Sequence, residues 1–164
     1  MATFIALIRG INVGGNKKLS MADLKSACES LGYTDVRTLL NSGNVIFDAK
    51  RCKALEIEKA LPIDVRVILR TPAELKKAIE RNPLKGEPNR LMIMFLEREP
   101  DGELEWPGPE KTHLDGTHLY LYYPNGAGTS KLTNAVIERK LGVAGTARNL
   151  NTINKLLTLS HPKG

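Results

Sequence analysis

Two β-rich runs and the turn between them occupy residues 36–47, which read Val36-Arg-Thr-Leu-Leu-Asn-Ser-Gly-Asn-Val-Ile-Phe47. Residues 36–40 and 45–47 are rich in the β-branched and large apolar side chains that favour strands. The four residues between them, Asn41-Ser-Gly-Asn44, are typical of a tight turn, because Asn and Gly tolerate the backbone conformations that turns require. This stretch therefore predicts a β-hairpin.

The segments around this hairpin predict two helices and two further strands. Residues 3–9 form a short apolar run, as expected for a buried strand. Apolar side chains then recur at helical spacing over residues 20–31 and 51–61, and residues 65–69 form another buried strand. The resulting order, β-α-β-β-α-β over residues 1–70, predicts a ferredoxin-like subdomain.

The rest of the chain, residues 71–164, predicts a second, smaller α+β subdomain packed on the first. Its expected elements are a helix opened by Thr71 and Glu74, a strand over residues 91–96, a loop over 100–109, a hairpin around Asp115-Gly116, a helix capped by Thr129 or Ser130 that runs to Leu141, and a last helix over 149–159. The first of the two C-terminal helices follows the antiparallel strands of this subdomain. In the first subdomain, Ser20 and Asp23 are expected to cap the first helix of the chain. No flexible linker separates the two sections, so we expect an α+β protein whose subdomains, 1–70 and 71–164, pack closely.

The hairpin around Asp115-Gly116 supports one inference about histidine. With these two residues as the turn, His113 lies opposite His118, at a Cβ separation of about 4.5–5.5 Å. Two histidines are too few for a zinc site, which needs three or four ligands. We interpret the strand after the turn as amphipathic, with Leu119, Leu121 and Tyr123 on the face opposite to Tyr120 and Tyr122.

The chain is basic. It has 164 residues, with 24 Lys and Arg against 18 Asp and Glu, a net charge of +6 and a pI near 9.4. Residues 97–115 hold seven acidic and two basic side chains, whereas residues 116–164 hold one acidic and six basic. This balance favours polyanionic partners, above all nucleic acid. The simpler interpretation of the charge distribution, which comes first, is an acidic surface loop and a solvated basic helix face. The alternative is a basic face, built from both ends of the chain, that meets phosphate groups.

The composition excludes several classes of protein. No stretch approaches the ~20 apolar residues that cross a bilayer, so no membrane association is expected. Cys28 and Cys52 are too few for a disulfide framework, which indicates a cytoplasmic protein. The chain has no Cys-x-x-Cys and no His-Glu-x-x-His motif, and we expect no metal and no cofactor. Cys52 lies between Arg51 and Lys53, whose positive charges are expected to lower its pKa.

The first candidate site is the loop Arg9-Gly-Ile-Asn-Val-Gly-Gly-Asn-Lys-Lys18, between the first predicted strand and helix. Gly10 and Gly15 have the spacing of a phosphate-binding Walker A loop, but Asn16 stands where that motif has its lysine. We therefore expect backbone amides and lysine side chains to bind an anion here, without nucleotide hydrolysis. The alternative is a plain connection in which the glycines adopt positive φ. The candidate residues are Arg9, Asn12, Gly14, Gly15 and Lys17.

The second candidate is Thr146-Ala-Arg-Asn-Leu-Asn-Thr152, the densest polar cluster in the chain, at the predicted start of the last helix. The Arg148 guanidinium matches a carboxylate or a phosphate, and Asn149 and Asn151 add hydrogen-bonding groups beside the free amides of the helix. The alternative is a polar helix cap with Arg148 in an internal ion pair.

Ser42 and Asn44, in the turn of the first hairpin, are the third candidate, although both residue types also hydrogen-bond to the local backbone in turns. Our hypothesis is that the first loop, this turn and the Arg148 cluster meet on one basic surface that binds a phosphate-bearing partner, most simply nucleic acid. The second hypothesis is an enzyme that acts on a small phosphorylated or carboxylated substrate through Arg9, Lys17 and Arg148. The third is a protein-interaction module, for example a homodimer.

Several blocks of residues also occur together, in the same order, in a known family. They are Ala6-Leu-Ile-Arg-Gly-Ile-Asn-Val-Gly-Gly15, Met21, Arg37-Thr38, Ser42-Gly-Asn-Val45, Phe47, Asn82-Pro83, Thr146-Ala-Arg-Asn149 and Asn151-Thr152. Over essentially its whole length the chain resembles the bacterial domain of unknown function 1697 family. The resemblance implies a two-part α+β protein with a ferredoxin-like unit, and it implies no activity. The chain departs from the family at Ser20, where Pro is usual, and at Leu150, where Trp is usual.

Overall fold

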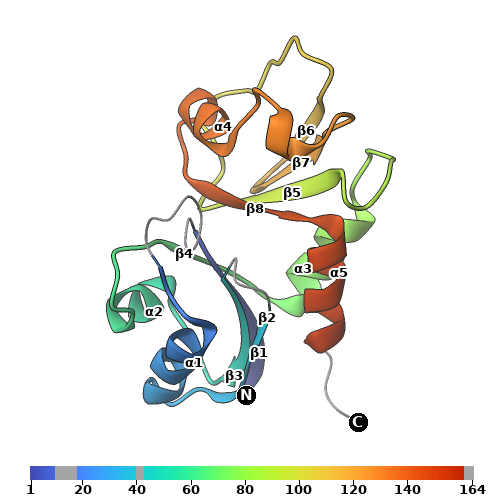
Figure 1. Ribbon diagram of the computed structural model, residues 1–164. Helices are drawn as coiled ribbons and strands as arrows, with labels where there is room; N and C mark the ends of the chain where they lie inside the picture. The colour runs from blue at the N-terminus through green and yellow to red at the C-terminus, as the bar shows by residue number, and fades with distance from the viewer. Residues whose placement is uncertain (10–17, 40–42, 161–164) are drawn as a thin grey trace. The chain divides into compact units, whose positions relative to one another are not determined.

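The structure is a computed structural model that describes residues 1–9, 18–39 and 43–160 (Figure 1). The chain folds into two units, unit 1 (Met1–Lys76 and Lys155–Gly164) and unit 2 (Lys77–Asn154). The division falls inside two helices, α3 (Pro72–Glu80) and α5 (Leu150–Leu159), so unit 1 is assembled from both ends of the chain. The protein is of the α+β class, as predicted, and its described residues form two four-stranded antiparallel sheets.

Unit 1 contains the βαββαβ order that the sequence predicts. Its elements are β1 (Ala2–Ile8), α1 (Met21–Ser30), β2 (Thr34–Leu39), β3 (Asn44–Ala49), α2 (Ala54–Ala60) and β4 (Val67–Arg70). The strands lie in the order β2-β3-β1-β4, and each neighbouring pair is antiparallel. The predicted hairpin is confirmed as β2 and β3, with Leu39 paired to Asn44. The element order is that of the ferredoxin-like arrangement.

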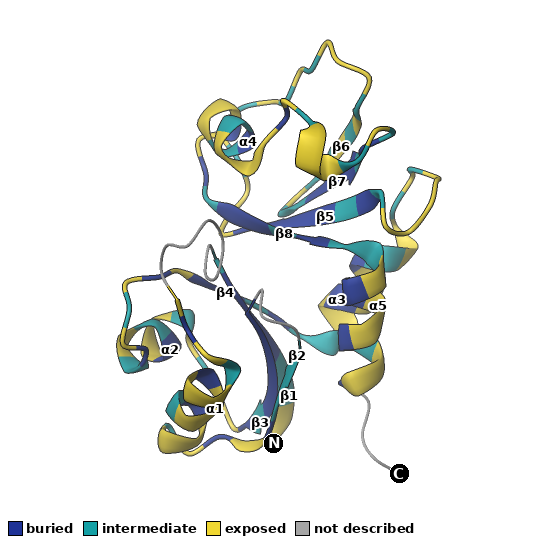
Figure 2. Cartoon of the chain, viewed as in Figure 1, coloured by how far each residue is buried: buried dark blue, intermediate teal, exposed yellow. Residues whose placement is uncertain are grey.

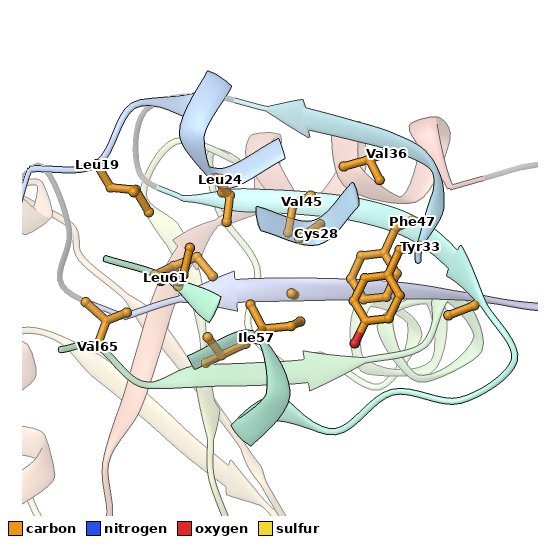
Figure 3. Close-up of a cluster of buried hydrophobic side chains, with 14 residues drawn as sticks. Leu19, Leu24, Cys28, Tyr33, Val36, Val45, Phe47, Ile57, Leu61 and Val65 are labelled. Carbon is orange, nitrogen blue, oxygen red and sulfur yellow. The ribbon is translucent and has the colours of Figure 1, made fainter. Parts of the chain in front are cut away.

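The core of unit 1 lies between this sheet and the helices α1 and α2 (Figure 3). Phe47 of β3 is fully buried there, and its ring stacks on that of Tyr33 with the ring centroids 4.3 Å apart. Leu24 and Cys28 of α1 and Ile57 of α2 are fully buried in the same cluster. Helical spacing places these apolar side chains on one face of each helix, as the sequence predicts.

The opposite face of the same sheet is also apolar. Ile5, Leu7 and Ile46 alternate along their strands with the residues of the core, and all three are fully buried. Figure 2 shows buried residues in dark blue, and they make up much of β1. Arg37 of β2 donates a hydrogen bond to the backbone carbonyl of Leu159, so the last turn of α5 lies beside this face. A sheet that is buried on both faces offers no open surface on which bases could stack.

Two predicted helix caps are confirmed in unit 1. At the start of α1, Ser20 Oγ accepts a hydrogen bond from the backbone N–H of Asp23 at 3.0 Å. At the start of α3, Thr71 Oγ1 accepts from the N–H of Glu74 at 3.2 Å, while the Glu74 carboxylate accepts from the N–H of Thr71 at 2.9 Å. The second pair is the reciprocal capping box that the sequence predicts.

Unit 2 is built on the second sheet, in the order β6-β7-β5-β8. Its strands are β5 (Leu91–Leu96), β6 (Lys111–Asp115), β7 (His118–Tyr122) and β8 (Gly145–Asn149), and helix α4 (Asn134–Leu141) precedes β8. Leu119, Leu121 and Tyr123 are buried in one cluster with Ile137 and Leu141 of α4. This confirms that Leu119, Leu121 and Tyr123 share a buried face. The prediction of an amphipathic strand is wrong, however, because Tyr120 on the opposite face is also fully buried.

Two helix predictions in unit 2 are wrong. The polar cluster predicted at a helix start belongs largely to strand β8, which pairs with β5 from Gly145 opposite Leu96 to Asn149 opposite Met92. Pairing with a neighbouring strand outweighs the polar composition, because strand formation depends strongly on the partner strand. Helix α4 is capped by Thr133, whose Oγ1 accepts from the N–H of Val136, and not by Thr129 or Ser130.

The hairpin of β6 and β7 turns at Gly116 and Thr117, one residue later than predicted. Asp115 pairs with His118, and His113 therefore pairs with Tyr120 instead of His118. Gly116 has a φ of +61°, a left-handed conformation that glycine adopts without strain. The predicted pairing of the two histidines is wrong, because the turn sets the register of both strands.

Candidate functional site

Three segments that are distant in the sequence meet at one end of the unit 1 sheet. Arg9 directly follows β1, and its backbone N–H donates a hydrogen bond to the carbonyl of Arg66 at 2.9 Å. The backbone N–H of Ile8 donates to the carbonyl of Gly43, between β2 and β3, at 2.8 Å. The start of the first candidate loop and the end of the candidate hairpin turn therefore lie at the same end of the sheet.

Basic side chains gather at this end. Arg66 is exposed and Arg9 is half-buried. Lys18 is exposed and precedes Leu19, which lies at the same end of the core as Val65 (Figure 3). We call this end of the sheet, with Arg9, Lys18 and Arg66, the basic edge.

Five of the predicted site residues lie outside the described residues. They are Asn12, Gly14, Gly15, Lys17 and Ser42. The anion-binding role assigned to them stays a prediction. Their described neighbours in the sequence are Arg9, Lys18 and Gly43.

Asn44 of the hairpin turn has a structural contact of its own. The residue is fully buried at the start of β3, where it pairs with Leu7 of β1 and Leu39 of β2. Its Nδ2 donates a hydrogen bond to the carbonyl of Leu39 at 2.7 Å. This is the local turn contact that the sequence allows as an alternative to ligand binding, and it holds β2 and β3 together at the basic edge.

Arg148 is a buried cation in strand β8, not a residue of an exposed helix start. It lies opposite Ile93 of β5, and only 6% of its surface is exposed. Its Nη1 donates hydrogen bonds to the carbonyl of Ala147 at 2.9 Å and to Thr146 Oγ1. Burial lowers the pKa of the guanidinium to about 10, so the side chain remains charged at neutral pH. Arg148 thus has the charge that anion binding needs, but not the exposure of a surface anchor.

Asn149 and Asn151 differ in their surroundings although both belong to the predicted cluster. Asn149 directly precedes helix α5, and its Oδ1 accepts a hydrogen bond from the backbone N–H of Thr152 at 2.8 Å. This is the geometry of a helix N-cap, the alternative role that the sequence allows. Asn151 lies in the first turn of α5 and is exposed.

The cap contact of Asn149 leads to a testable prediction. Asn149→Ala is expected to lower the free energy of unfolding by about 1 kcal/mol, because the N–H of Thr152 loses its acceptor. Asn149→Asp keeps an acceptor and places a negative charge at the helix N-terminus, so its stability should stay close to that of the wild type. Urea denaturation measures both variants. Equal losses in the two variants would contradict the cap assignment.

The three candidate blocks fall in different units. Arg9 and Gly43, which flank the first loop and the hairpin turn in the sequence, both lie at the basic edge of unit 1. Arg148 and the start of α5 belong to unit 2. A single surface that includes Arg148 therefore stays a prediction, whereas the position of Arg9 and Gly43 at one end of the sheet is a feature of unit 1.

A cavity in unit 2 holds candidate residues that sequence reasoning missed. It has a volume of about 370 Å³ and is lined by residues that include Trp106, Glu110, Tyr123 and Ser130. From the sequence, this region is expected to be part of an acidic surface loop. The signal that was available is the placement of the only tryptophan of the chain four residues before an acidic residue, in a stretch rich in Pro and Gly.

The expectation for Cys52 is wrong, because its thiol is less acidic than usual. Burial raises the pKa of Cys52 and the nearby Glu56 carboxylate raises it further, although the hydroxyl of Tyr33, 3.1 Å from Sγ, acts in the opposite direction. Arg51 and Lys53 are both exposed, and solvent screens their charges. Cys52 therefore lacks the acidic thiol of a reactive cysteine.

Across residues 1–9, 18–39 and 43–160, no three or more His, Cys, Asp or Glu side chains cluster closely enough to hold a metal ion. Over the same ranges, no helix has the length and apolar character of a membrane span; α1 and α5, for instance, have 10 residues each.

The fold and the sites together define an α+β protein with a basic edge in one unit and a cavity in the other. The family described as "Protein of unknown function (DUF1697)" matches residues 1–120, and the chain belongs to this family. The chain is also similar in structure to a conserved bacterial protein from Streptococcus pneumoniae, with a TM-score of 0.71, 24% sequence identity, and coverage of 97% of this chain and 98% of that chain. This similarity shows a shared fold. No curated protein matches the chain.

Proposed function

We propose that this protein binds a phosphate-bearing partner, most simply a nucleic acid, at the basic edge of unit 1. The observation that carries the proposal is the backbone contact of Arg9 with Arg66, which brings two arginines from distant parts of the chain to one end of the sheet. In the sequence, Arg9 begins a glycine-rich segment that contains Lys17 and leads to Lys18.

The chemistry of these residues supports a phosphate ligand. Arginine forms paired hydrogen bonds to phosphate oxygens, and lysine adds a mobile positive charge. Glycine-rich segments allow several backbone amides to approach one anion. The net charge of +6 attracts a polyanion to the protein before any specific contact forms.

The unit 1 sheet indicates which part of a nucleic acid would be bound. Ile5, Leu7 and Ile46 fill the face of the sheet that lies away from α1 and α2, and all three are fully buried. Bases therefore have no exposed aromatic platform on this sheet of the kind that RNA-recognition motifs use. We propose that the basic edge contacts the phosphate backbone, which supplies affinity with little dependence on base sequence.

A salt titration tests this proposal. The affinity for a single-stranded oligonucleotide can be measured by fluorescence anisotropy. The logarithm of the association constant is expected to fall linearly with the logarithm of the salt concentration, with a slope of about −0.7 for each neutralised phosphate. Arg9→Ala and Arg66→Ala are each expected to weaken binding several-fold at low salt. Each variant should also reduce the magnitude of the salt slope by about 0.7, which is the contribution of one phosphate contact.

Lys50 provides a matched control for these variants. It is exposed and follows Ala49, which pairs with Ala2 at the other end of β1, so it lies roughly 20 Å along the sheet from Arg9. Lys50→Ala removes the same charge and should leave the affinity and the slope nearly unchanged. Flat salt dependence, or an equal effect of Lys50→Ala and Arg66→Ala, would exclude the basic edge as the binding site. Stabilisation by nucleotides or sugar phosphates without oligonucleotide binding would favour the small-substrate hypothesis instead.

A further inference from the structure

The cavity of unit 2 lies between two loops that are brought together by the fold. One side is formed by residues before β6, including Trp106 and Glu110, and the other by Tyr123 and the residues that follow β7, including Ser130. Its volume, about 370 Å³, is within the range of pockets that bind small organic molecules. The proposed role of the basic edge uses none of these residues.

Glu110 is held in this cavity by two hydrogen bonds to one of its oxygens. Its Oε1 accepts from Ser130 Oγ at 2.9 Å and from Trp106 Nε1 at 3.3 Å. The Ser130 hydroxyl itself accepts from the backbone N–H of Leu132 at 3.0 Å, so its proton is directed to Glu110. These contacts fix the orientation of the carboxylate.

The other oxygen of Glu110 has a different environment. Oε2 is buried, and among the described residues it has no hydrogen-bond partner. A buried carboxylate oxygen without a donor is unfavourable, because the carboxylate has lost solvation there without a compensating contact. A ligand that carries an N–H group and a positive charge would provide both the donor and the compensating charge.

The rest of the wall suits a cation with an apolar body. Tyr123 lines the cavity although it is largely buried, and its hydroxyl already donates to the carbonyl of Leu132 at 2.9 Å. Burial, with a contribution from the charge of Glu110, raises the pKa of Tyr123 to about 12 and keeps the phenol neutral. Trp106 adds a second aromatic ring, and aromatic faces attract organic cations.

Gly108 shows that these groups are closely fitted. A Cβ atom at this position would lie 2.5 Å from Trp106 Nε1 and 3.3 Å from Glu110 Oε2. The backbone at Gly108 therefore approaches the indole and the carboxylate more closely than any other residue type would permit. This close approach limits the positions that the indole can take beside Glu110.

We propose that the unit 2 cavity is a binding site for a small organic cation, an ammonium or guanidinium group on an apolar body. The cationic N–H donates to Glu110 Oε2, and the apolar body packs against Trp106 and Tyr123. Lys131 also lines the cavity, but it is exposed, and solvent and salt screen its repulsion of a cation.

Tryptophan fluorescence provides a direct assay of this site, because Trp106 is the only tryptophan in the chain. Titration with phenethylamine is expected to give a saturable change in emission. Titration with 3-phenylpropanoate, which carries a carboxylate in place of the ammonium group, is expected to give none. N-acetyl-lysine methylamide, which mimics a lysine side chain in a protein, is a third probe. If it binds more tightly than phenethylamine, the cation comes from a lysine side chain. If it binds more weakly, the cation comes from a small aromatic amine.

Glu110→Gln tests the role of the carboxylate. The amide oxygen can still accept from Trp106 and Ser130, but an NH₂ group replaces Oε2 and opposes a cationic donor. Phenethylamine affinity is expected to fall about tenfold or more. Glu105→Gln is the matched control, because Glu105 is exposed in the same loop and carries the same charge, and its affinity should stay within about twofold of the wild type.

The outcomes that overturn this proposal are distinct from those that overturn the basic edge. Absence of a saturable signal with phenethylamine, equal binding of 3-phenylpropanoate, or unchanged affinity in Glu110→Gln would each exclude a cation site. Thermal unfolding establishes that both variants fold. If Glu110→Gln does not fold, the comparison of amine and acid on the wild-type protein still decides the question.

Discussion

Phe47→Ala is expected to lower the free energy of unfolding by about 3–5 kcal/mol. The Phe47 side chain is fully buried between the sheet of unit 1 and its two helices. Its ring stacks on Tyr33 at 4.3 Å and lies 5.9 Å from the ring of Phe4, so truncation removes aromatic contacts as well as apolar burial. The neighbouring strands are hydrogen-bonded on both sides of β3 and cannot move in to fill the space. Chemical denaturation followed by circular dichroism measures the loss.

Two further variants serve as controls for the Phe47 prediction. Phe47→Leu keeps a large apolar side chain, so it should cost less, about 1–2 kcal/mol. Leu55→Ala, on α2, truncates a side chain that is 56% exposed, and the free energy of unfolding should change by less than about 0.5 kcal/mol. A Phe47→Ala variant as stable as Leu55→Ala would show that this cluster does not carry the stability of unit 1.

Gly145→Ala is expected to destabilise unit 2 by about 2–3 kcal/mol. Gly145 begins β8 opposite Leu96, and an added Cβ would lie 2.7 Å from the backbone oxygen of Phe95 and 2.9 Å from Leu96 Cδ2. The Phe95 oxygen belongs to β5, which is held between β7 and β8, so the clash cannot be relieved by a side-chain rotation. Gly145→Val should cost more, because its branched side chain adds bulk at the same contact.

Gly128→Ala is the matched control for Gly145. A Cβ at Gly128 would meet nothing within 4 Å, and its backbone φ lies outside the left-handed region. Its stability should stay within about 0.5 kcal/mol of the wild type. Thermal unfolding monitored through Trp106 fluorescence reports on unit 2 directly. Equal effects at Gly128 and Gly145 would show that the added methyl group acts through the unfolded chain and not through the clash with Phe95.

The elements of unit 1 were predictable because their signals are local. The cap at Ser20, the apolar positions of α1 and the turn before Asn44 each depend on residues within a few positions of one another. Strand β8 had no such signal, since Gly145-Thr-Ala-Arg-Asn149 is short and largely polar. It is a strand because the edge of β5 offers backbone donors and acceptors that must be paired.

The candidate sites follow the same rule. Arg9 could be singled out from its sequence context, but Arg66 could not, because only the pairing of β1 with β4 brings it to Arg9. Glu110 was interpreted as one acid of a surface loop. Its role depends on Ser130, 20 residues later, whose hydroxyl reaches Glu110 only after the chain has passed through β6 and β7.

Composition, helix caps and apolar periodicity sufficed to establish the basic character of the chain and the βαββαβ order, and short blocks of residues carried the resemblance to its family. These are properties of single residues or of short segments, and they are present before the chain folds. The register of β6 on β7, the strand nature of β8, the burial of Arg148 and the unpartnered oxygen of Glu110 are not. They arise from contacts between distant segments, because burial and hydrogen-bond partners depend on which parts of the chain pack together.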